Sequence, residues 1–210
     1  MKNLDKLSKI IFFGAIWGLI EATIGYALHL LPALIAGSIM FPIVVFILYH
    51  AYKSLGSRKA IFFVGLIAIM IKATNLFLPF LFPAKTINPM IAMAIQTLLV
   101  FAIIPLLDSK KLGVKIASIV MISIGWRLAM VGYYGVNYLI TDFLDFRLKG
   151  IEPALTFIVT EGLISGAFAL GLIFATNPIK ALAKFDRSRI NPILSSAILV
   201  IAIVLTLVKF

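Results

Sequence analysis

The sequence predicts an all-α protein, a polytopic bundle of transmembrane helices, from three observations. Of its 210 residues 62% are hydrophobic and the mean hydropathy is +1.13, values that ordinary soluble domains do not reach. The apolar residues fall into separate runs of about 20, the length that crosses a hydrocarbon core at 1.5 Å per residue. The basic residues gather in short clusters between these runs. We therefore expect one integral membrane domain over residues 1–210.

Seven spans are predicted, at about 10–31, 33–53, 60–79, 89–107, 115–135, 153–176 and 192–209. Almost nothing separates the first two, which predicts a tight antiparallel hairpin. Asn88-Pro89 and Asn191-Pro192 each place an N-cap Asn before an N1 Pro, and Glu152-Pro153 marks the sixth start in a similar way. A basic segment that begins at Asn177-Pro178 is expected to lie along the membrane interface.

The positions of Lys and Arg predict the orientation, because cytoplasmic loops carry the excess of positive charge. With the N-terminus inside, the cytoplasmic segments hold Lys2, Lys6, Lys9, Lys53, Arg58, Lys59, Lys110, Lys111, Lys115, Lys180, Lys184, Arg187 and Arg189. The outer segments hold only Lys85, Arg147, Lys149 and Lys209, so the C-terminus is expected outside. This placement also argues against nucleic acid as the reason for the net charge of +11, since few aromatic residues alternate with the basic ones.

Four ionisable residues interrupt the spans: the acids Glu21 and Glu161 and the bases Lys72 and Arg127. A charge at such a depth costs roughly 3 kcal/mol or more unless it is paired, protonated or reached by water. Together with polar side chains at similar depth they form one candidate ligand-binding set: Glu21, Lys72, Asn75, Gln96, Arg127, Tyr134 and Glu161. Arg127 carries the most weight, because a guanidinium stays charged and its fork suits a carboxylate or a phosphate. The alternative is purely structural pairing, above all of Lys72 with a glutamate.

Small residues follow one face of the first span. Gly14, Gly18 and Ala22 form a small-xxx-small run, which lets another helix approach closely and is interpreted as a helix-docking face. Two outer loops, 80–88 and 136–152, either cap a cavity that opens outward or are interfacial connectors. Trp17 and Trp126 could stack on a flat ligand, although core packing is the commoner role for such residues.

The motifs of several function classes are missing. No GxxxxGK[ST], HExxH or GxSxG occurs and there is no cysteine, so no catalytic residue, metal site or cofactor is predicted. His29 and His50 fall near span ends, where an interfacial position is favoured over metal binding. Any transport driven by ATP would need a partner that supplies the ATPase.

The length, the basic loops, the missing ATPase motif and the small-residue first span resemble the substrate-binding S-components of energy-coupling factor importers. In that family the first helix presents a small-residue patch to a transmembrane coupling subunit, and Gly14, Gly18 and Ala22 are the matching positions. The family usually has six spans with both ends inside, whereas seven are predicted here. The resemblance implies a subunit in the cytoplasmic (inner) membrane of a prokaryote, with coupling subunit and ATPases supplied in trans.

The expected function is a solute-binding subunit of a micronutrient importer, which binds a small anionic or zwitterionic ligand in an outward-facing pocket. Lys72 and Arg127 would hold the anionic group, and Glu21 and Glu161 would balance charge or hold a cationic part. Two alternatives stay open. One is a structural or assembly protein with interhelical ion pairs, and the other is a proton-coupled secondary transporter that titrates Glu21 or Glu161. An intramembrane enzyme has the least support.

Overall fold

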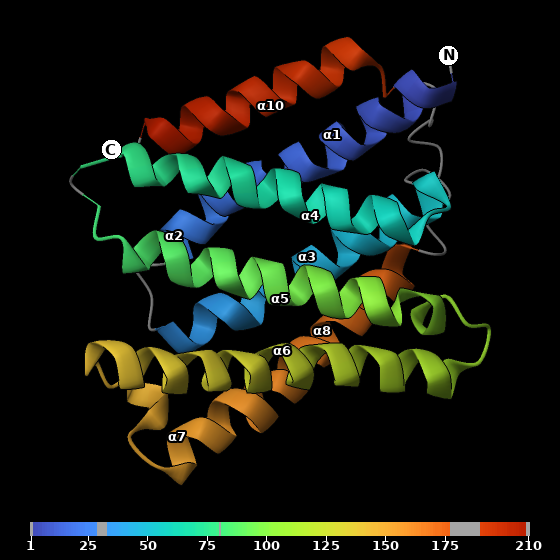
Figure 1. Cartoon of the computed structure of the whole chain (residues 1–210). Helices are drawn as coiled ribbons and strands as arrows, with labels where there is room; N and C mark the ends of the chain where they lie inside the picture. Colours follow the sequence, from blue (N-terminus) through green and yellow to red (C-terminus); the bar gives the residue numbers. More distant parts are fainter. Residues whose placement is uncertain (1, 29–32, 80, 177–189, 209–210) are drawn as a thin grey trace.

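The computed structural model describes residues 2–28, 33–79, 81–176 and 190–208, and every element in these ranges is helical (Figure 1). In chain order the elements are α1 (Lys2–Ile20), η1 (Glu21–Gly25), α2 (Tyr26–Leu28), α3 (Ala33–Leu55), α4 (Arg58–Ala73), η2 (Thr74–Phe77), α5 (Ala84–Leu107), α6 (Leu112–Thr141), η3 (Phe146–Leu148), α7 (Ile151–Leu155), η4 (Thr156–Thr160), α8 (Glu161–Thr176) and α10 (Pro192–Leu207). The turns η1 and η4 are π-helical and η2 and η3 are 3₁₀-helical.

Among the described residues, six helical segments are long and apolar enough to cross a membrane. They are Asn3–Leu28, Gly37–Leu55, Arg58–Phe77, Ala84–Leu107, Leu112–Thr141 and Ile151–Ala175. By length and composition they indicate a multi-pass helical membrane protein, as the sequence predicts. The π-helical and 3₁₀ turns continue the neighbouring α-helices, so α1–η1–α2, α4–η2 and α7–η4–α8 each form one rod.

The six rods close a ring. α1 packs against α4, α4 against α5, α5 against α6, α6 against α8, α8 against α3, and α3 against α1. α3 also contacts α4 and α5, and its Phe41, Val44 and Leu48 are at most 1% exposed, so this helix reaches the middle of the bundle. The hydrophobic core therefore centres on α3, with Trp17 and Trp126 among its members.

The two ends of the bundle differ in charge. Lys53, at the end of α3, forms an ion pair with Asp108, at the end of α5, with 2.9 Å between Nζ and Oδ1. This end also carries Arg58 and Lys59 after the α3–α4 turn and Lys110 and Lys111 in the α5–α6 turn, and we call it the basic end. The opposite end, called the loop end, holds the η2–α5 and α6–α7 connections (Figure 1). The basic segment at 177–189 and residues 29–31 and 209 of the predicted spans lie outside the described residues.

One predicted helix start is wrong. α5 begins at Ala84 rather than after Asn88, and Pro89 lies inside the helix. The backbone carbonyl of Pro83 accepts hydrogen bonds from the amides of Thr86 and Ile87, both at 2.9 Å, so the chain is already helical there. Asn88 is not an N-cap: its Oδ1 accepts a hydrogen bond from the Tyr133 hydroxyl at 2.9 Å.

Other boundaries shift as well, and α1 begins at Lys2 rather than at the predicted residue 10. The sixth rod begins at Ile151 with Gly150 as its N-cap, two residues before the predicted start, so Glu152 is not the cap but lies in the first turn, where an acid is favoured. α6 continues six residues beyond the predicted end at 135, to Thr141, where Asp142 adopts a left-handed conformation with φ 56° and closes the helix.

The close approach of α1 to α4 depends on two of the predicted small residues. A Cβ added to Gly14 would lie 2.7 Å from Ile67 Cβ and 2.9 Å from the carbonyl oxygen of Val64. A Cβ added to Gly18 would meet the side chain of Ile71. Both glycines are therefore covered by a helix of the same chain, and Ala22, the third member of the predicted docking face, is also buried.

α10 lies outside the ring, along α1 and in contact with α4 (Figure 1). Its predicted start is confirmed: Asn191 Oδ1 accepts a hydrogen bond from the Leu194 amide at 2.8 Å and Pro192 occupies the first helical position. The Ser195 hydroxyl donates to the carbonyl oxygen of Ser8 at 2.8 Å and so joins α10 to α1. With 16 residues, α10 is shorter than the roughly 20 that cross a bilayer, so the seventh span stays a prediction.

Candidate functional site

A cavity of about 800 Å³ lies inside the bundle and extends to the loop end. Its walls come from the first rod (α1, η1 and α2), from α3, α5, α6 and η4, and from both connections at that end. On α6 the lining residues run from Trp126 to Thr141, a stretch of about 22 Å at the helical rise. We call it the bundle cavity; its volume is within the range of pockets that hold small organic ligands.

Three buried aromatic side chains contribute to the wall of the bundle cavity. Trp17, Trp126 and Phe157 are all buried and all line it. The Trp126 ring stacks on Phe41 with a centroid separation of 6.1 Å and meets Phe157 edge-on at 5.8 Å. The indole N–H groups of Trp17 and Trp126 have no hydrogen-bond partner among the described residues. The wall of the cavity therefore contains two buried hydrogen-bond donors without an acceptor in the described ranges. Packing within the core does not supply one, although buried polar groups normally have a partner.

Both loops singled out in the sequence contribute to the cavity. Phe82 and Lys85 come from the η2–α5 connection and the start of α5, and Phe143 and Arg147 come from the α6–α7 connection. Of the two interpretations of these loops, the geometry favours the one in which they cap a cavity. Lys85 is exposed, whereas Arg147 is only 8% exposed, so the two cations occupy the rim and the interior respectively.

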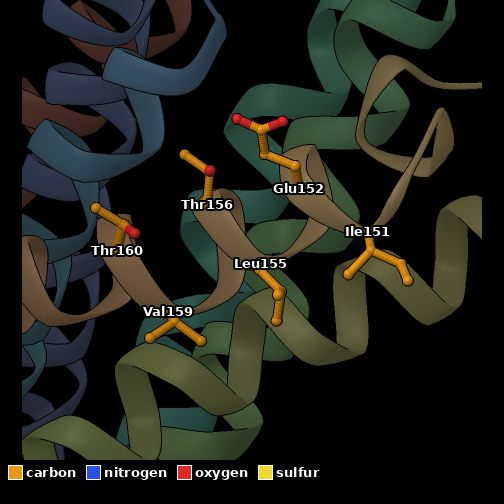
Figure 2. A pocket seen from close by; sticks show the side chains of 6 residues that line it. All are labelled: Ile151, Glu152, Leu155, Thr156, Val159 and Thr160. Carbon is orange, nitrogen blue, oxygen red and sulfur yellow. The ribbon is translucent and has the colours of Figure 1, made fainter.

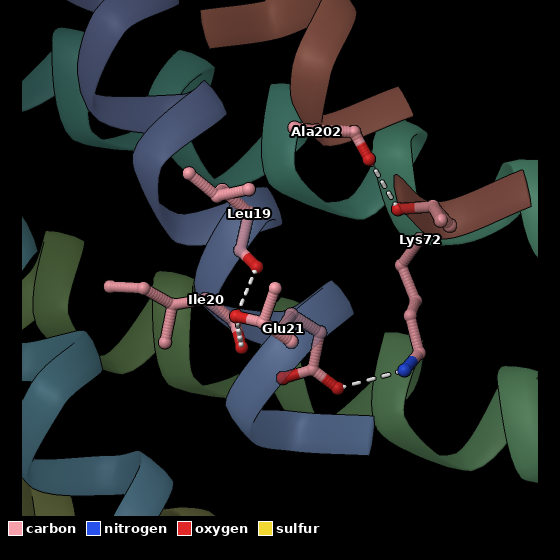
Figure 3. A network of polar contacts seen from close by, with 7 residues as sticks. Leu19, Ile20, Glu21, Lys72 and Ala202 are labelled. Atoms are coloured by element: carbon pink, nitrogen blue, oxygen red, sulfur yellow. Dashed lines mark hydrogen bonds and ion pairs between the residues drawn. The ribbon is translucent and has the colours of Figure 1, made fainter. Parts of the chain in front are cut away.

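Glu21 and Lys72 form one buried ion pair, between η1 and the end of α4 (Figure 3). Lys72 Nζ lies 2.9 Å from Glu21 Oε1, and the two side chains are 2% and 10% exposed. Glu21 begins the π-helical turn, and π-helical turns are frequent at functional sites. Glu21 lines the bundle cavity, whereas Lys72 lies behind it and does not.

Arg127 and Glu161 belong to a second polar group, between α3, α6 and α8. Ser38 joins them: Arg127 Nη2 donates to its hydroxyl at 3.3 Å, and that hydroxyl donates to Glu161 Oε2 at 3.4 Å. Arg127 Nη1 also donates to the carbonyl and hydroxyl oxygens of Ser123, at 3.1 and 3.2 Å. Arg127 Nε and Glu161 Oε1 have no hydrogen-bond partner within the described ranges. Glu161 follows directly after η4, and Glu21 is the first residue of η1, so these two buried acids both lie at a π-helical turn.

The seven predicted site residues therefore separate by position. Glu21, Gln96 and Tyr134 line the bundle cavity, whereas Lys72, Asn75, Arg127 and Glu161 do not. All seven are buried, and Asn75 lies in η2. Contrary to the expectation, the four charges form two separate groups rather than one cluster. Similar depth along the spans was visible in the sequence, but the face that each helix turns to the cavity depends on packing; the roles of these residues in binding stay predictions.

Arg147 is the site residue that the sequence reasoning missed, because it was assigned to an outer loop. Its Nη1 lies 3.0 and 3.1 Å from Asp145 Oδ1 and Oδ2, and its backbone amide donates to Oδ1 at 3.0 Å. Its guanidinium carbon lies 4.9 Å from the ring centroid of Tyr134, 4.4 Å from Phe146 and 4.7 Å from Phe157. The available signal was the sequence DFRL, in which one aromatic residue, Phe146, stands between the opposite charges of Asp145 and Arg147.

A second hollow of about 500 Å³ lies on the surface of the sixth rod (Figure 2). Among the described residues its lining comes from α7 and η4: Ile151, Glu152, Leu155, Thr156, Val159 and Thr160. Most of these side chains are exposed, and no second rod in the described part of the chain contributes a wall. It is an open depression on one helix and lacks the converging polar groups of a binding site.

Comparison with known proteins finds no matching family model, no similar curated protein and no similar solved structure.

Proposed function

We propose that this protein is a solute-binding subunit of a membrane importer, and that the bundle cavity holds the solute. The observation that carries the proposal is a cavity of about 800 Å³ with a mainly apolar lining, partly aromatic, into which polar and charged side chains are set. The interiors of helical proteins are close-packed, so a void of this size is costly unless water or a ligand fills it. Small-molecule sites have this composition, an apolar wall with a few placed polar groups.

The charge distribution supports a cavity that opens to the outer side of the membrane. The basic end corresponds to the cytoplasmic side under the positive-inside rule, so the loop end and the cavity face outward. A solute taken from outside would enter past Lys85 and Phe143, which lie at the cavity rim. The proposed location is the cytoplasmic membrane of a prokaryote, and the proposed solute is a micronutrient.

The importer role rests on the resemblance to S-components and on the missing ATP-binding motif. Energy would come from ATPases and a coupling subunit in trans. Gly14 and Gly18 pack on α4, so a coupling subunit would bind a different face from the one that the resemblance indicates. The exposed apolar face of α10, with Ile193 at 81% and Val200 at 57%, is available to lipid or to such a helix.

A structural or assembly role is the second candidate, and one observation favours it. Lys72 has its carboxylate partner, and Arg127 is joined to Glu161 through Ser38, so both buried groups are held within the chain. A proton-coupled transporter is the third candidate, because Glu21 touches both the cavity and Lys72. The three differ in whether the cavity holds a solute and in what drives uptake.

A cavity-filling variant tests the proposal. Ala92 lines the cavity, whereas Ala102, on the same helix, is exposed and does not. We expect native mass spectrometry to detect a retained small molecule on the wild-type protein and on Ala102→Phe, and to find it lost from Ala92→Phe. Co-purification with ATPase subunits would support the importer role, and uptake driven by a pH gradient in proteoliposomes would favour the transporter. Identical small-molecule content in all three proteins contradicts solute binding in the cavity.

A further inference from the structure

We propose that Arg147 binds an anionic group of the solute, a carboxylate or a phosphate, and that the solute carries this group on a flat aromatic body. The inference rests on the proposed function, since it assumes that the bundle cavity is a binding site. It differs from the sequence-based expectation, which assigned the anion to Lys72 and Arg127; neither of these lines the cavity.

One edge of the Arg147 guanidinium is occupied and another is unused. Nη1 contacts both oxygens of Asp145, at 3.0 and 3.1 Å. Nε is buried without a hydrogen-bond partner, and the hydrogen bonds of Arg147 within the described part of the chain come from its backbone amide and Nη1, so that Nη2 makes none. Nε and Nη2 together form the side-on fork that receives a planar carboxylate or a phosphate through two parallel hydrogen bonds.

The surroundings hold this fork in place before a ligand arrives. The Arg147 side chain is 10% exposed and is surrounded by the rings of Tyr134, Phe146 and Phe157, each within 5 Å of Cζ by centroid distance. Asp145 fixes the remaining edge. A donor fork held in this way loses little conformational entropy on binding, which raises affinity.

The charges at the cavity also favour an anion. Glu21 is neutralised by Lys72 and Asp145 by Arg147. Lys85, at the rim, has no ion-pair partner among the described residues and leaves one positive charge in excess. An entering anion is therefore attracted at the rim and meets the Arg147 fork inside.

The aromatic wall specifies the rest of the solute. Phe157 lies between Trp126 and Arg147: its ring centroid is 5.8 Å from that of Trp126 and 4.7 Å from Arg147 Cζ. A flat molecule of one or two rings can therefore contact Trp126 while its acidic group reaches Arg147. The free indole N–H groups of Trp17 and Trp126 would donate to acceptor atoms on that body.

Tryptophan fluorescence tests this proposal directly, because the chain has 2 Trp residues and both line the cavity. Quenching of purified protein in nanodiscs is titrated with 4-nitrobenzoate, with 4-nitrophenyl phosphate and with the neutral 4-nitrobenzamide. We expect wild-type protein to bind at least one anionic probe about tenfold or more tightly than the amide, the effect of a charge-assisted fork. Comparison of the two anionic probes shows whether the site prefers carboxylate or phosphate.

Variants then assign the effect to the fork. Arg147→Lys keeps the charge but removes the fork, Arg147→Gln removes both, and Lys149→Gln removes an exposed cation of the same loop that does not line the cavity. We expect the preference for the anion to fall below about threefold in both Arg147 variants and to persist in Lys149→Gln. A preference retained in Arg147→Gln overturns the assignment to this residue.

The wild-type protein alone separates the two levels of the proposal. Equal, saturable binding of 4-nitrobenzoate, 4-nitrophenyl phosphate and 4-nitrobenzamide overturns the anion site while leaving solute binding in the cavity intact. Absence of saturable quenching by all three probes overturns both. Since this comparison needs no variant, it holds even when a change at Arg147 prevents folding.

Discussion

Separating Glu21 from Lys72 should have unequal effects on stability, depending on which partner is removed. Lys72 is 2% exposed and lies behind the bundle cavity, whereas Glu21 is 10% exposed and lines it. In Glu21→Met the ammonium of Lys72 is left buried without a carboxylate. In Lys72→Met the carboxylate of Glu21 is left facing a cavity that water can enter.

The magnitudes follow from this geometry. Removing one partner of a buried ion pair costs about 3–5 kcal/mol when the remaining charge has no water, and a lysine at mid-membrane costs about 3 kcal/mol. We therefore expect Glu21→Met to lower the free energy of unfolding by about 3 kcal/mol. For Lys72→Met we expect about 1 kcal/mol, because cavity water solvates the carboxylate. The double variant leaves no charge unpaired, so its loss should be about 1 kcal/mol or less.

Steric trapping of the purified protein in bicelles measures the free energy of unfolding of the wild type, both single variants and the double variant. A double-mutant cycle then gives the coupling energy between Glu21 and Lys72. It should be favourable, which means that the double variant loses less free energy of unfolding than the two single variants together. Equal losses in the two single variants would refute the inference that water reaches Glu21 but not Lys72. A double variant as unstable as the two single losses combined would show that the pair itself contributes nothing.

Two further predictions concern packing and capping. Gly14→Ala should lower the free energy of unfolding by about 1–3 kcal/mol, because the added Cβ would lie 2.7 Å from Ile67 Cβ. At Gly132 nothing lies within 4 Å of an added Cβ, so Gly132→Ala should be neutral or stabilising by about 0.5 kcal/mol. Thermal unfolding compares the two, and equal midpoints would contradict the tight α1–α4 contact. Asn191→Ala should cost about 1 kcal/mol and expose the Leu194 amide to hydrogen exchange, because that amide loses its acceptor; unchanged protection would show that the cap is not needed.

The candidate site was only partly predictable. The sequence predicted that the four charged side chains are buried, and they are. A charge in the middle of an apolar run of membrane length faces the protein interior, because exposure to lipid is too costly. Their grouping did not follow. Glu21 and Arg127 both face protein, but the rotation of the first rod and of α6 about their axes turns Glu21 toward the cavity and Arg127 toward Ser38 of α3. Rotation about a helix axis is set by packing against neighbours, which residue spacing alone does not specify.

Loop residues were the hardest to assign. Arg147 was visible as one basic residue of an outer segment, and nothing in its spacing showed that three rings and Asp145 would hold it inside the bundle. Lys85 presents the converse case: its predicted place at the loop end agrees with its exposed position at the cavity rim.

The sequence by itself determined the helical membrane class, the approximate position of six membrane-length rods and the capped start of α10, because hydropathy, span length and capping chemistry are local properties. Only the tertiary structure decided that α1 closes on α4, that the buried charges form two groups, and that aromatic side chains from distant segments enclose one cavity. These features depend on which faces meet across the bundle. The faces that meet are those that give the lowest free energy for all contacts together, so no single stretch of the chain specifies them.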